Sequence, residues 1–335
     1  MMKEAISKIV KGVDLTEEES SSVMNEVMTG GASPAQIGAL LVAWRMKGET
    51  VEEITGSARV MREKATRVEA PADVIDTCGT GGDASMTFNI STAAAFVSSA
   101  AGAPVAKHGN RSVSSRSGSA DVLRALGVNI EAEVSRVEQC IREAGIGFLF
   151  APMLHGAMKY AAPVRREIGI RSIFNILGPL TNPAGSKRQV IGVYDPALTD
   201  VLAKVLYKLG STHAFVVRGE DGLDEITLTT ETRVTELKDS SIRTYHLKPE
   251  DLGFDRCAPE DLKGGGPDEN AEIILGILNG RKGPARDIVI INAAAAITAG
   301  GISKSIEEGV AAARGAIDSG EALNKLERLK EISNR

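Results

Sequence analysis

The sequence of 335 residues has little of what marks several common protein classes. Its three cysteines (Cys78, Cys140 and Cys257) are far apart, which excludes a disulfide framework and a zinc knuckle. Its four histidines form no HExxH motif or helical pair. No run of 18 apolar residues occurs, so we expect no membrane span. The N-terminal stretch MMKEAISKIVKG lacks the apolar core and cleavage site of a signal peptide. We therefore expect a reduced, cytoplasmic protein without structural zinc.

An excess of positive charge is also missing. The chain has 44 acidic and 39 basic residues, which gives a formal net charge of −5. Binding of nucleic acid through bulk charge requires a basic excess that releases counterions. We therefore expect no nucleic-acid partner, and any phosphate site must be a local cluster. Aromatic residues make up only 4% of the chain, whereas 35 residues are glycine, a balance typical of close-packed α/β structure with backbone loops near a ligand.

Residues 1–70 have the pattern of a small helical domain. Capping boxes begin two of its helices, at Thr16 and at Thr50, and Ser33-Pro34 begins another as cap and first residue. No residue type in this segment indicates chemistry. The segment therefore predicts a helical bundle or cap beside a larger domain.

From residue 71 onward, short apolar strands alternate with loops and alanine-rich helices, which is the pattern of a parallel α/β sheet. We predict an α/β protein with a small N-terminal helical domain over 1–70 and a larger α/β domain over 71–335. Its central sheet is expected to be mostly parallel, and the last 50 residues are expected to be helical. The predicted strands lie at 74–77, 104–106, 147–150, 190–193 and 214–217, with β-rich alternation over 223–248.

A glycine-rich loop, CGTGGD at 78–83, follows the first predicted strand. Because glycine has no side chain, the backbone N–H groups of such a loop can approach an anion closely. A helix begins soon afterwards at NIST (89–92), whose free amides and hydroxyls can donate to a phosphate. The two segments together predict a phosphate site, and the alternative is a plain glycine turn between a strand and a helix.

Two other phosphate motifs do not fit this loop. Gly79, Gly81 and Ala84 match the G-x-G-x-x-A dinucleotide fingerprint, but that motif needs a helix at once and an acid at the end of the next strand. Here the helix begins later and the next strand ends in Lys107-His108. The sequence G-x-x-x-x-G-K-[ST] is absent. We therefore reject NAD binding and a P-loop NTPase.

A second loop, KHGNRSVSSRSGS at 107–119, follows the next predicted strand. Lys107, Arg111 and Arg116 supply charge, and the serines and backbone amides supply directional donors. Because parallel strands end at the same edge of a sheet, this loop is expected beside the glycine loop. We favour a site for a pyrophosphate or a doubly phosphorylated ligand over a solvated serine-rich loop.

An acidic segment, GEDGLDE at 219–225, follows a later predicted strand. Mg²⁺ commonly takes one or two carboxylates and completes its shell with water and phosphate, so Asp224 and Glu225 predict a magnesium site. Adjacent residues on a regular strand face opposite ways. Both acids can therefore reach one site only from a loop, or by binding two ions. The alternative is an acidic surface turn.

Five segments in this order closely resemble the anthranilate phosphoribosyltransferase family, and the resemblance spans nearly the whole chain. They are DTCGTGGD (76–83), NIST (89–92), KHGNR (107–111), RSIFNILGPLTNP (171–183) and DGLDE (221–225). The resemblance implies transfer of phosphoribose from phosphoribosyl pyrophosphate to the amine of anthranilate, with release of pyrophosphate, in tryptophan biosynthesis. It also implies Mg²⁺, a homodimer, and a fold shared with pyrimidine nucleoside phosphorylases. In that fold, part of 160–185 returns to the helical domain.

The resemblance also implies roles for individual residues. Asn110 and Arg165 are expected to contact anthranilate, and Ser91, Asp224 and Glu225 are expected to hold Mg²⁺. The residues expected to bind the phosphoribosyl donor or line its site are Gly79, Gly82, Asp83, Thr87, Asn89, Ile90, Ser91, Thr92, Lys107, His108, Gly109, Asn110, Arg111, Ser112, Val113, Ser114, Ser115 and Ser119.

The expected catalytic residues are Lys107, Asn110 and Arg165. Bond breaking at the anomeric carbon builds positive charge on the sugar and negative charge on pyrophosphate, which Mg²⁺ and Lys107 can stabilise. The aromatic amine is already unprotonated at neutral pH, so it needs no strong general base. One arginine can pair bidentately with the anthranilate carboxylate. Spacing does not choose among Arg165, Arg166 and Arg171, and the resemblance favours Arg165.

Three alternatives stay open. A pyrimidine nucleoside phosphorylase of the same fold would use free phosphate as its nucleophile, but the acidic pair and the combination of Asn110 with Arg165 favour the transferase. A non-catalytic relative that binds nucleic acid is disfavoured by the negative net charge and by the intact Asp224-Glu225 pair. A phosphoribosyltransferase with another aromatic acceptor, such as a substituted anthranilate, is compatible with the sequence.

Overall fold

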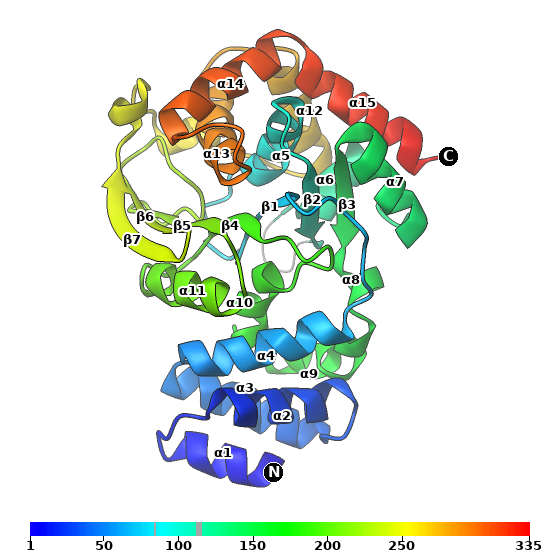
Figure 1. Ribbon diagram of the computed structural model, residues 1–335, viewed down its shortest axis with the longest axis vertical. Helices are drawn as coiled ribbons and strands as arrows, with labels where there is room; N and C mark the ends of the chain where they lie inside the picture. The colour runs from blue at the N-terminus through cyan, green and yellow to red at the C-terminus, as the bar shows by residue number, and fades with distance from the viewer. Residues whose placement is uncertain (84, 112–115) are drawn as a thin grey trace.

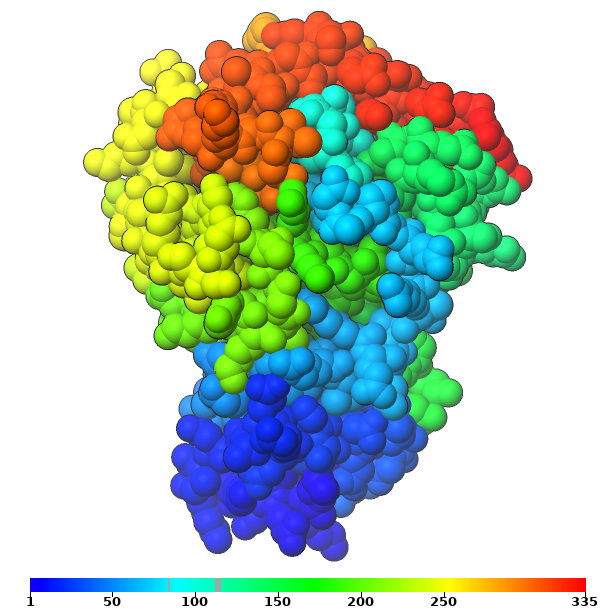
Figure 2. Space-filling view, in the orientation of Figure 1, coloured from blue at the N-terminus to red at the C-terminus, as the bar shows by residue number. Residues whose placement is uncertain are grey.

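A computed structural model describes residues 1–83, 85–111 and 116–335. A seven-stranded sheet lies in the middle of the molecule, with helices on both faces and a helical domain at one end (Figure 1). The chain begins at the tip of the helical domain and ends at the opposite end of the molecule (Figure 1). In the space-filling view the helical domain forms a lobe that is narrower than the rest of the molecule (Figure 2). This arrangement confirms the predicted fold class.

The N-terminal bundle begins where the sequence predicts. The Thr16 hydroxyl accepts a hydrogen bond from Glu19 N at 3.2 Å, and the Glu19 carboxylate accepts one from Thr16 N at 3.0 Å. The third and fourth helices begin with the same reciprocal arrangement. Local side-chain chemistry therefore fixes where these helices start. The four helices are α1 (Met2–Val10), α2 (Glu17–Met28), α3 (Pro34–Lys47) and α4 (Val51–Lys64).

Helices from the middle of the chain pack against this bundle. A side chain at Gly38 of α3 would touch Val164, and Arg62 of α4 donates a hydrogen bond to the Leu180 carbonyl at 2.7 Å. Val164 and Leu180 belong to the same buried apolar cluster as Trp44 of α3. The helices of this segment are α8 (Ala151–Leu154), the 3-10 helix η1 (Gly156–Tyr160), α9 (Ala162–Ile168) and α10 (Ile173–Leu180).

The sheet has the strand order β3-β2-β1-β4-β5-β6-β7. Its strands are β1 (Ile75–Gly79), β2 (Val105–Gly109), β3 (Ile146–Phe150), β4 (Arg188–Gly192), β5 (His213–Gly219), β6 (Thr232–Lys238) and β7 (Ser241–Leu247). Strands β1 to β5 pair in parallel, and β6 and β7 pair antiparallel. The chain places β2 and β3 on one side of β1 and then places β4 on its other side. This reversal is a topological switch point, where open α/β sheets bind ligands at the carboxyl ends of their strands.

Helices cover both faces of the sheet (Figure 1). One face carries α10 and α11 (Ala197–Lys208). The other face holds the largest buried apolar cluster, enclosed by α5 (Ile90–Ala100), α6 (Ser119–Ala125), α7 (Val134–Ala144), α12 (Pro267–Leu278), α13 (Pro284–Ala299), α14 (Ile306–Asp318) and α15 (Glu321–Ser333). Short 3-10 helices, η2 (Pro249–Leu252) and η3 (Pro259–Leu262), connect β7 to α12. No helix in the described part of the chain is both long and apolar enough to span a bilayer.

The structure corrects the β-rich alternation predicted over 223–248. Only its second half forms strands, β6 and β7, and these are joined by a turn in which Asp239 and Ser240 have φ of +47° and +66°. Two positive φ values are typical of the type I′ turn that suits a β-hairpin. Residues 226–229 form a loop instead. The threonine hydroxyls of this loop are hydrogen-bonded by a side chain: the Asp221 carboxylate accepts from Thr227 at 2.6 Å and from Thr229.

Candidate active site

Four of the parallel strands end in glycine where the chain leaves the sheet, at Gly79, Gly109, Gly192 and Gly219. The loops after β1, β2 and β5 are those in which the sequence predicts site residues. Because these strands run in the same direction, their loops meet at the carboxyl edge of the sheet, beside the switch point. A hydrogen bond from Thr80 N to the Gly192 carbonyl at 2.9 Å joins the ends of β1 and β4.

The loop that carries Asp224 lies directly against the ends of β1 and β4. A Cβ at Gly79 would overlap the Asp224 carboxylate, and a Cβ at Gly192 would overlap the Asp224 carbonyl group. Gly81 and Gly82 have φ of +67° and +77°, in the left-handed region that favours glycine. Glycine at these positions therefore permits both the close approach of the acidic loop and the reversal of the chain after β1.

The two predicted metal carboxylates contact different segments of the chain. The Asp224 carboxylate accepts a hydrogen bond from Gly81 N at 2.9 Å, and the Glu225 carboxylate accepts one from Ser91 N at 3.1 Å. Both neighbours can do so because they lie in a loop rather than in a strand. Burial raises the pKa of Asp224 to about 7, and the nearby Asp83 carboxylate adds to the rise. Burial, followed by the charge of Asp224, raises the pKa of Glu225 well above its usual range.

Lys107 is the buried cation at this edge. Its Nζ donates hydrogen bonds to the Thr77 carbonyl and to Ser91 Oγ, the latter at 3.2 Å. Burial lowers the pKa of Lys107, whereas the charges of Asp76 and Glu225 act in the opposite direction. The ammonium therefore lies between the end of β1 and the first turn of α5, within the electrostatic reach of the acidic loop.

These residues fit a magnesium ion. Asp224 and Glu225 supply hard oxygen ligands, and the pKa of each carboxylate is raised partly by neighbouring carboxylates. A divalent cation would relieve that repulsion. In the part of the chain that the structure describes, no three Asp, Glu, His or Cys side chains are arranged to hold a metal by themselves. Mg²⁺ commonly takes one or two carboxylates and completes its shell with water and substrate phosphate.

The start of α5 combines ligand-facing groups with structural ones. Thr92 Oγ1 is buried and has no hydrogen-bond partner among the described residues, so it can donate to a bound ligand. The Asn89 side chain is already engaged: its Nδ2 donates to the Ser117 carbonyl at 3.1 Å, and its Oδ1 accepts from Asn270 Nδ2 at 3.0 Å. The amide N–H of Ile90 donates to the Phe88 carbonyl at 2.8 Å. Thr87 is bridged to Lys263 in a short antiparallel contact.

The loop after β2 is described at its two ends. Asn110 is exposed, and its carbonyl accepts from Ala120 N at 3.2 Å and from Ser119 Oγ at 3.4 Å. Gly109 allows Ser119 to approach, since a Cβ there would overlap the Ser119 hydroxyl. Arg111 forms an ion pair with Glu131 at 3.0 Å. The predicted residues Ser112, Val113, Ser114 and Ser115 lie outside the described residues.

Arg165, Arg166 and Arg171, the three candidates for the acceptor carboxylate, have different surroundings. Arg165 is half-buried, its guanidinium lies 5.1 Å from the Phe174 ring centroid, and no ion pair of this side chain occurs within the described ranges. Burial lowers its pKa. Arg166 is exposed. Arg171 donates to the Gly82 carbonyl, and its guanidinium stacks 4.2 Å from the Tyr194 ring centroid. Arg171 therefore supports the glycine loop, and Arg165 has a guanidinium to offer a ligand.

His108 lies at the same edge and pairs with His155. Their Nε2 atoms are 3.1 Å apart, so one ring donates its proton and the other accepts it. Burial lowers the pKa of His108 to about 3 and that of His155 to about 4. Both rings are therefore neutral at physiological pH, and neither adds charge to the site.

Two residues that hold the edge together, Asp76 and Asn182, were not predicted as site residues from the sequence. The buried Asp76 carboxylate accepts from His108 N at 3.0 Å and from Asn182 Nδ2 at 2.8 Å. Asn182 also donates to the Ala106 carbonyl at 2.8 Å, which ties β1, β2 and the loop before β4 together. Both residues lie within segments that carry the family resemblance, but nothing in the local pattern indicates that they touch.

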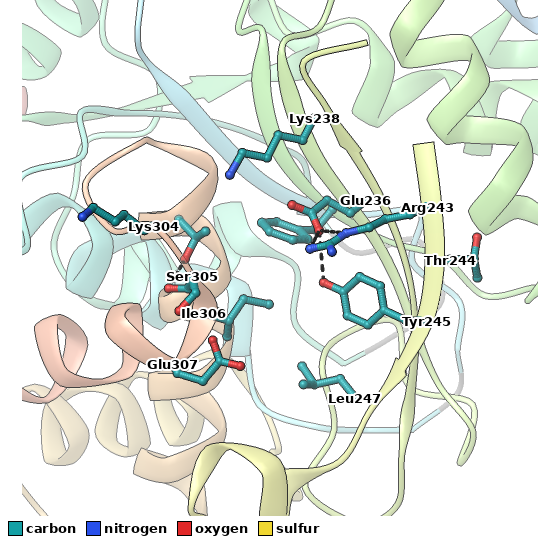
Figure 3. Close-up of a pocket in the computed structure, with 12 residues that line it drawn as sticks. Glu236, Lys238, Arg243, Thr244, Tyr245, Leu247, Lys304, Ser305, Ile306 and Glu307 are labelled. Atoms are coloured by element: carbon teal, nitrogen blue, oxygen red, sulfur yellow. Dashed lines mark hydrogen bonds and ion pairs between the residues drawn. The ribbon is translucent and has the colours of Figure 1, made fainter. Parts of the chain in front are cut away.

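A cavity of about 270 Å³ lies elsewhere, between the β6–β7 hairpin and the start of α14 (Figure 3). On its wall the Glu236 carboxylate accepts from Arg243 Nη2 at 2.7 Å and from the Tyr245 hydroxyl at 3.4 Å. None of the predicted site residues lines it. Because its buried acid is already paired, we place the active site at the carboxyl edge of the sheet and not here.

Comparison with known proteins identifies the family of this chain. The family model described as "Glycosyl transferase family, a/b domain" matches residues 71–323, and the one described as "Glycosyl transferase family, helical bundle domain" matches residues 3–65. An anthranilate phosphoribosyltransferase of Acetivibrio thermocellus is 56% identical over 335 residues, which cover 100% of this chain and 97% of that protein.

Solved structures are similar over the same length. The crystal structure of anthranilate phosphoribosyltransferase from Thermus thermophilus has a TM-score of 0.94 and 46% identity, with 99% of each chain covered. The Saccharomyces cerevisiae enzyme in complex with PRPP and Mg has a TM-score of 0.90 and 27% identity, with 99% of this chain and 98% of that chain covered.

Proposed function

This chain belongs to the glycosyl transferase family, and we infer that it transfers the phosphoribosyl group of phosphoribosyl pyrophosphate to the amine of anthranilate. The products are N-(5-phosphoribosyl)anthranilate and pyrophosphate, in a step of L-tryptophan biosynthesis. The observation that carries this function is the convergence at one sheet edge of a glycine loop, two partly buried carboxylates and a buried lysine. This set suits a metal-bound polyphosphate better than any neutral ligand.

We propose that the loops after β1 and β2, together with the start of α5, contact different parts of the phosphoribosyl donor. The amides of Gly79 and Gly82, the carboxylate of Asp83 and the side chain of Thr87 face the ribose and pyrophosphate. The first turn of α5, with Ser91 and Thr92, holds the phosphate, and the unpartnered hydroxyl of Thr92 supports this role. The remaining donor contacts are Asn89, Ile90, Lys107, His108, Gly109, Asn110, Arg111, Ser112, Val113, Ser114, Ser115 and Ser119.

Ser91, Asp224 and Glu225 are the proposed magnesium ligands. When bound, the ion neutralises charge that develops on the departing pyrophosphate. Lys107 contributes a second positive charge, and its hydrogen bonds to β1 and α5 keep the ammonium in place as charge develops. The amine of anthranilate is already unprotonated at neutral pH, so it needs no strong general base before attack, and the proton that its nitrogen loses after attack goes to solvent.

Arg165 and Asn110 are the proposed residues for the acceptor. A guanidinium can hold the anthranilate carboxylate through two parallel hydrogen bonds. The stacking of Arg165 on Phe174 orients it, and its half-buried position strengthens a pair with an anion. By fixing the carboxylate, the two residues would aim the amine at the anomeric carbon. Orientation of this kind can supply roughly 7–11 kcal/mol of the barrier.

The domain limits and the assembly are also proposals. We propose a helical domain over 1–70 that includes part of 160–185, and an α/β domain over 71–335, in a cytoplasmic homodimer. The packing of Val164 against α3 supports the first division. Val13 and Met46, which are 49% and 83% exposed, directly precede Asp14 and Lys47, which form an ion pair, and we propose that these exposed apolar side chains contact a second copy. Sedimentation as a monomer at micromolar concentration would refute the dimer.

A steady-state assay tests the function. We expect loss of anthranilate fluorescence that requires phosphoribosyl pyrophosphate and Mg²⁺ and that stops on addition of EDTA. Phosphorolysis of thymidine or uridine without turnover of anthranilate would instead favour the nucleoside phosphorylase of the same fold.

A further inference from the structure

One buried asparagine lies in the mostly apolar helix α13. In α13 every residue from Ile288 to Ala299 is buried, and Asn292 and Thr298 are the two polar ones among them. Asn292 is 2% exposed. A buried amide is costly unless its hydrogen bonds are made. The partners of Asn292 therefore indicate why a polar side chain occupies this position.

The Asn292 carboxamide forms hydrogen bonds with both the N–H and the carbonyl of one residue, Ile226. Its Oδ1 accepts from Ile226 N at 2.9 Å, and its Nδ2 donates to the Ile226 carbonyl at 2.8 Å. The second proton of Nδ2 goes to the Ile288 carbonyl, one turn earlier in α13, at 2.9 Å. A flipped amide would set its NH₂ group against an N–H and its oxygen against two carbonyls, so these partners fix its orientation.

Ile226 directly follows Glu225, and its side chain is 2% exposed in the main core. Asn292 therefore holds the backbone at the point where the acidic loop enters the core. Helix α13 also packs against α5, whose Ser91 N donates to the Glu225 carboxylate. The same helix thus sets the backbone of the acidic loop relative to the first turn of α5.

We propose that Asn292 is a positioning residue that holds Glu225 in place for the metal-bound phosphoribosyl donor. The proposal rests on the function inferred above. When both are ionised, Asp224 and Glu225 are like charges on neighbouring residues, and a fixed backbone keeps the two carboxylates from moving apart. Asp221 fixes the earlier part of the loop by accepting from Leu223 N at 3.1 Å, and Asn292 fixes the later part.

Direct metal binding tests this role. Mn²⁺ serves as a paramagnetic substitute for Mg²⁺, and its free concentration is followed by electron paramagnetic resonance in the presence of phosphoribosyl pyrophosphate. Partners that orient metal ligands typically change affinity by about 10- to 100-fold when removed, and we expect a loss of that size for Asn292→Ala. In a Glu225→Gln background, Asn292→Ala should cause no further loss, because it acts through Glu225.

Thr298→Val is the matched control. Thr298 is also buried in α13, and its hydroxyl donates to the Ala294 carbonyl at 2.8 Å, but it makes no hydrogen bond to the acidic loop. We expect it to lower the unfolding temperature while Mn²⁺ affinity stays that of the wild type. Unchanged Mn²⁺ affinity in Asn292→Ala, or an equal loss in Thr298→Val, would overturn the proposal.

Two further measurements keep the test decisive. If Asn292→Ala does not fold, Asn292→Ser replaces it in the Mn²⁺ assay. The second measurement is hydrogen exchange of the Ile226 amide in the wild type, which we expect to be slow. Fast exchange of that amide would overturn the proposed clamp. Failure of the wild type itself to bind phosphoribosyl pyrophosphate with Mn²⁺ would instead refute the proposed function, so the two failures are distinguishable.

Discussion

Gly192→Ala should disable the enzyme although residue 192 contacts no substrate in our account. Gly192 ends β4, and the backbone of Asp224 crosses it. A Cβ at this position would stand 3.1 Å from the Asp224 Cα and would overlap the carbonyl carbon and oxygen of the same residue. These are backbone atoms and not the end of a flexible side chain. The acidic loop must therefore move as a whole.

The size of the effect follows from that movement. Relief of an overlap with two backbone atoms requires a displacement on the order of 1 Å, and misplacement of that size can cost about 100-fold in rate. Overpacking should also lower stability by about 1–3 kcal/mol. We therefore expect kcat/KM to fall roughly 100-fold, with a higher Mg²⁺ requirement, in protein that is still folded at 25 °C.

The assay is steady-state turnover of anthranilate across a range of Mg²⁺ concentrations, together with thermal unfolding. Gly315→Ala is the control, because a Cβ there meets no atom within 4 Å and the residue lies inside α14. That change should leave activity intact and raise stability by about 0.5–1 kcal/mol. Wild-type kcat/KM and Mg²⁺ dependence in Gly192→Ala would refute the close approach as a requirement for activity.

Three further predictions concern charged groups. Burial raises the pKa of Asp224 from 3.8 to about 7, so ionisation of this carboxyl opposes folding. Without metal, Asp224→Asn should therefore unfold at a higher temperature than the wild type. This difference in unfolding temperature should widen from about pH 4 and level off above about pH 7. A constant difference would contradict the raised pKa. Arg165→Ala should raise KM for anthranilate about 10- to 100-fold, with little change in KM for the donor, and equal effects on both would contradict its role. Arg171→Ala removes the hydrogen bond to the Gly82 carbonyl and should raise KM for the donor instead. An effect confined to KM for anthranilate would show that Arg171, and not Arg165, binds the acceptor.

Features decided by neighbouring residues could be predicted from the sequence. The caps at Thr16 and Thr50 gave the correct starts of their helices, because a capping box spans only four residues. The glycine loop and the loop over 107–119 were expected at one edge because parallel strands align their carboxyl ends. That inference needed only the strand order along the chain.

Contacts between distant segments could not be predicted in this way. Asn292 and Ile226 are 66 residues apart, and Arg171 and Gly82 are 89 apart. Asn89 illustrates the same limit, because its side chain looks like a free cap in the sequence but is taken up by Ser117 and Asn270. Such pairings depend on how the helices pack on the sheet, and no local pattern carries that information.

Calorimetric titration with phosphoribosyl pyrophosphate tests the central claim, that the carboxyl edge of the sheet binds the donor together with a metal ion held by the acidic loop. We predict that the wild type binds the donor much more tightly with Mg²⁺ than with EDTA, and that Asp224→Asn loses this difference. Equal affinity with and without Mg²⁺ in the wild type, or the same gain from Mg²⁺ in Asp224→Asn, would contradict the account.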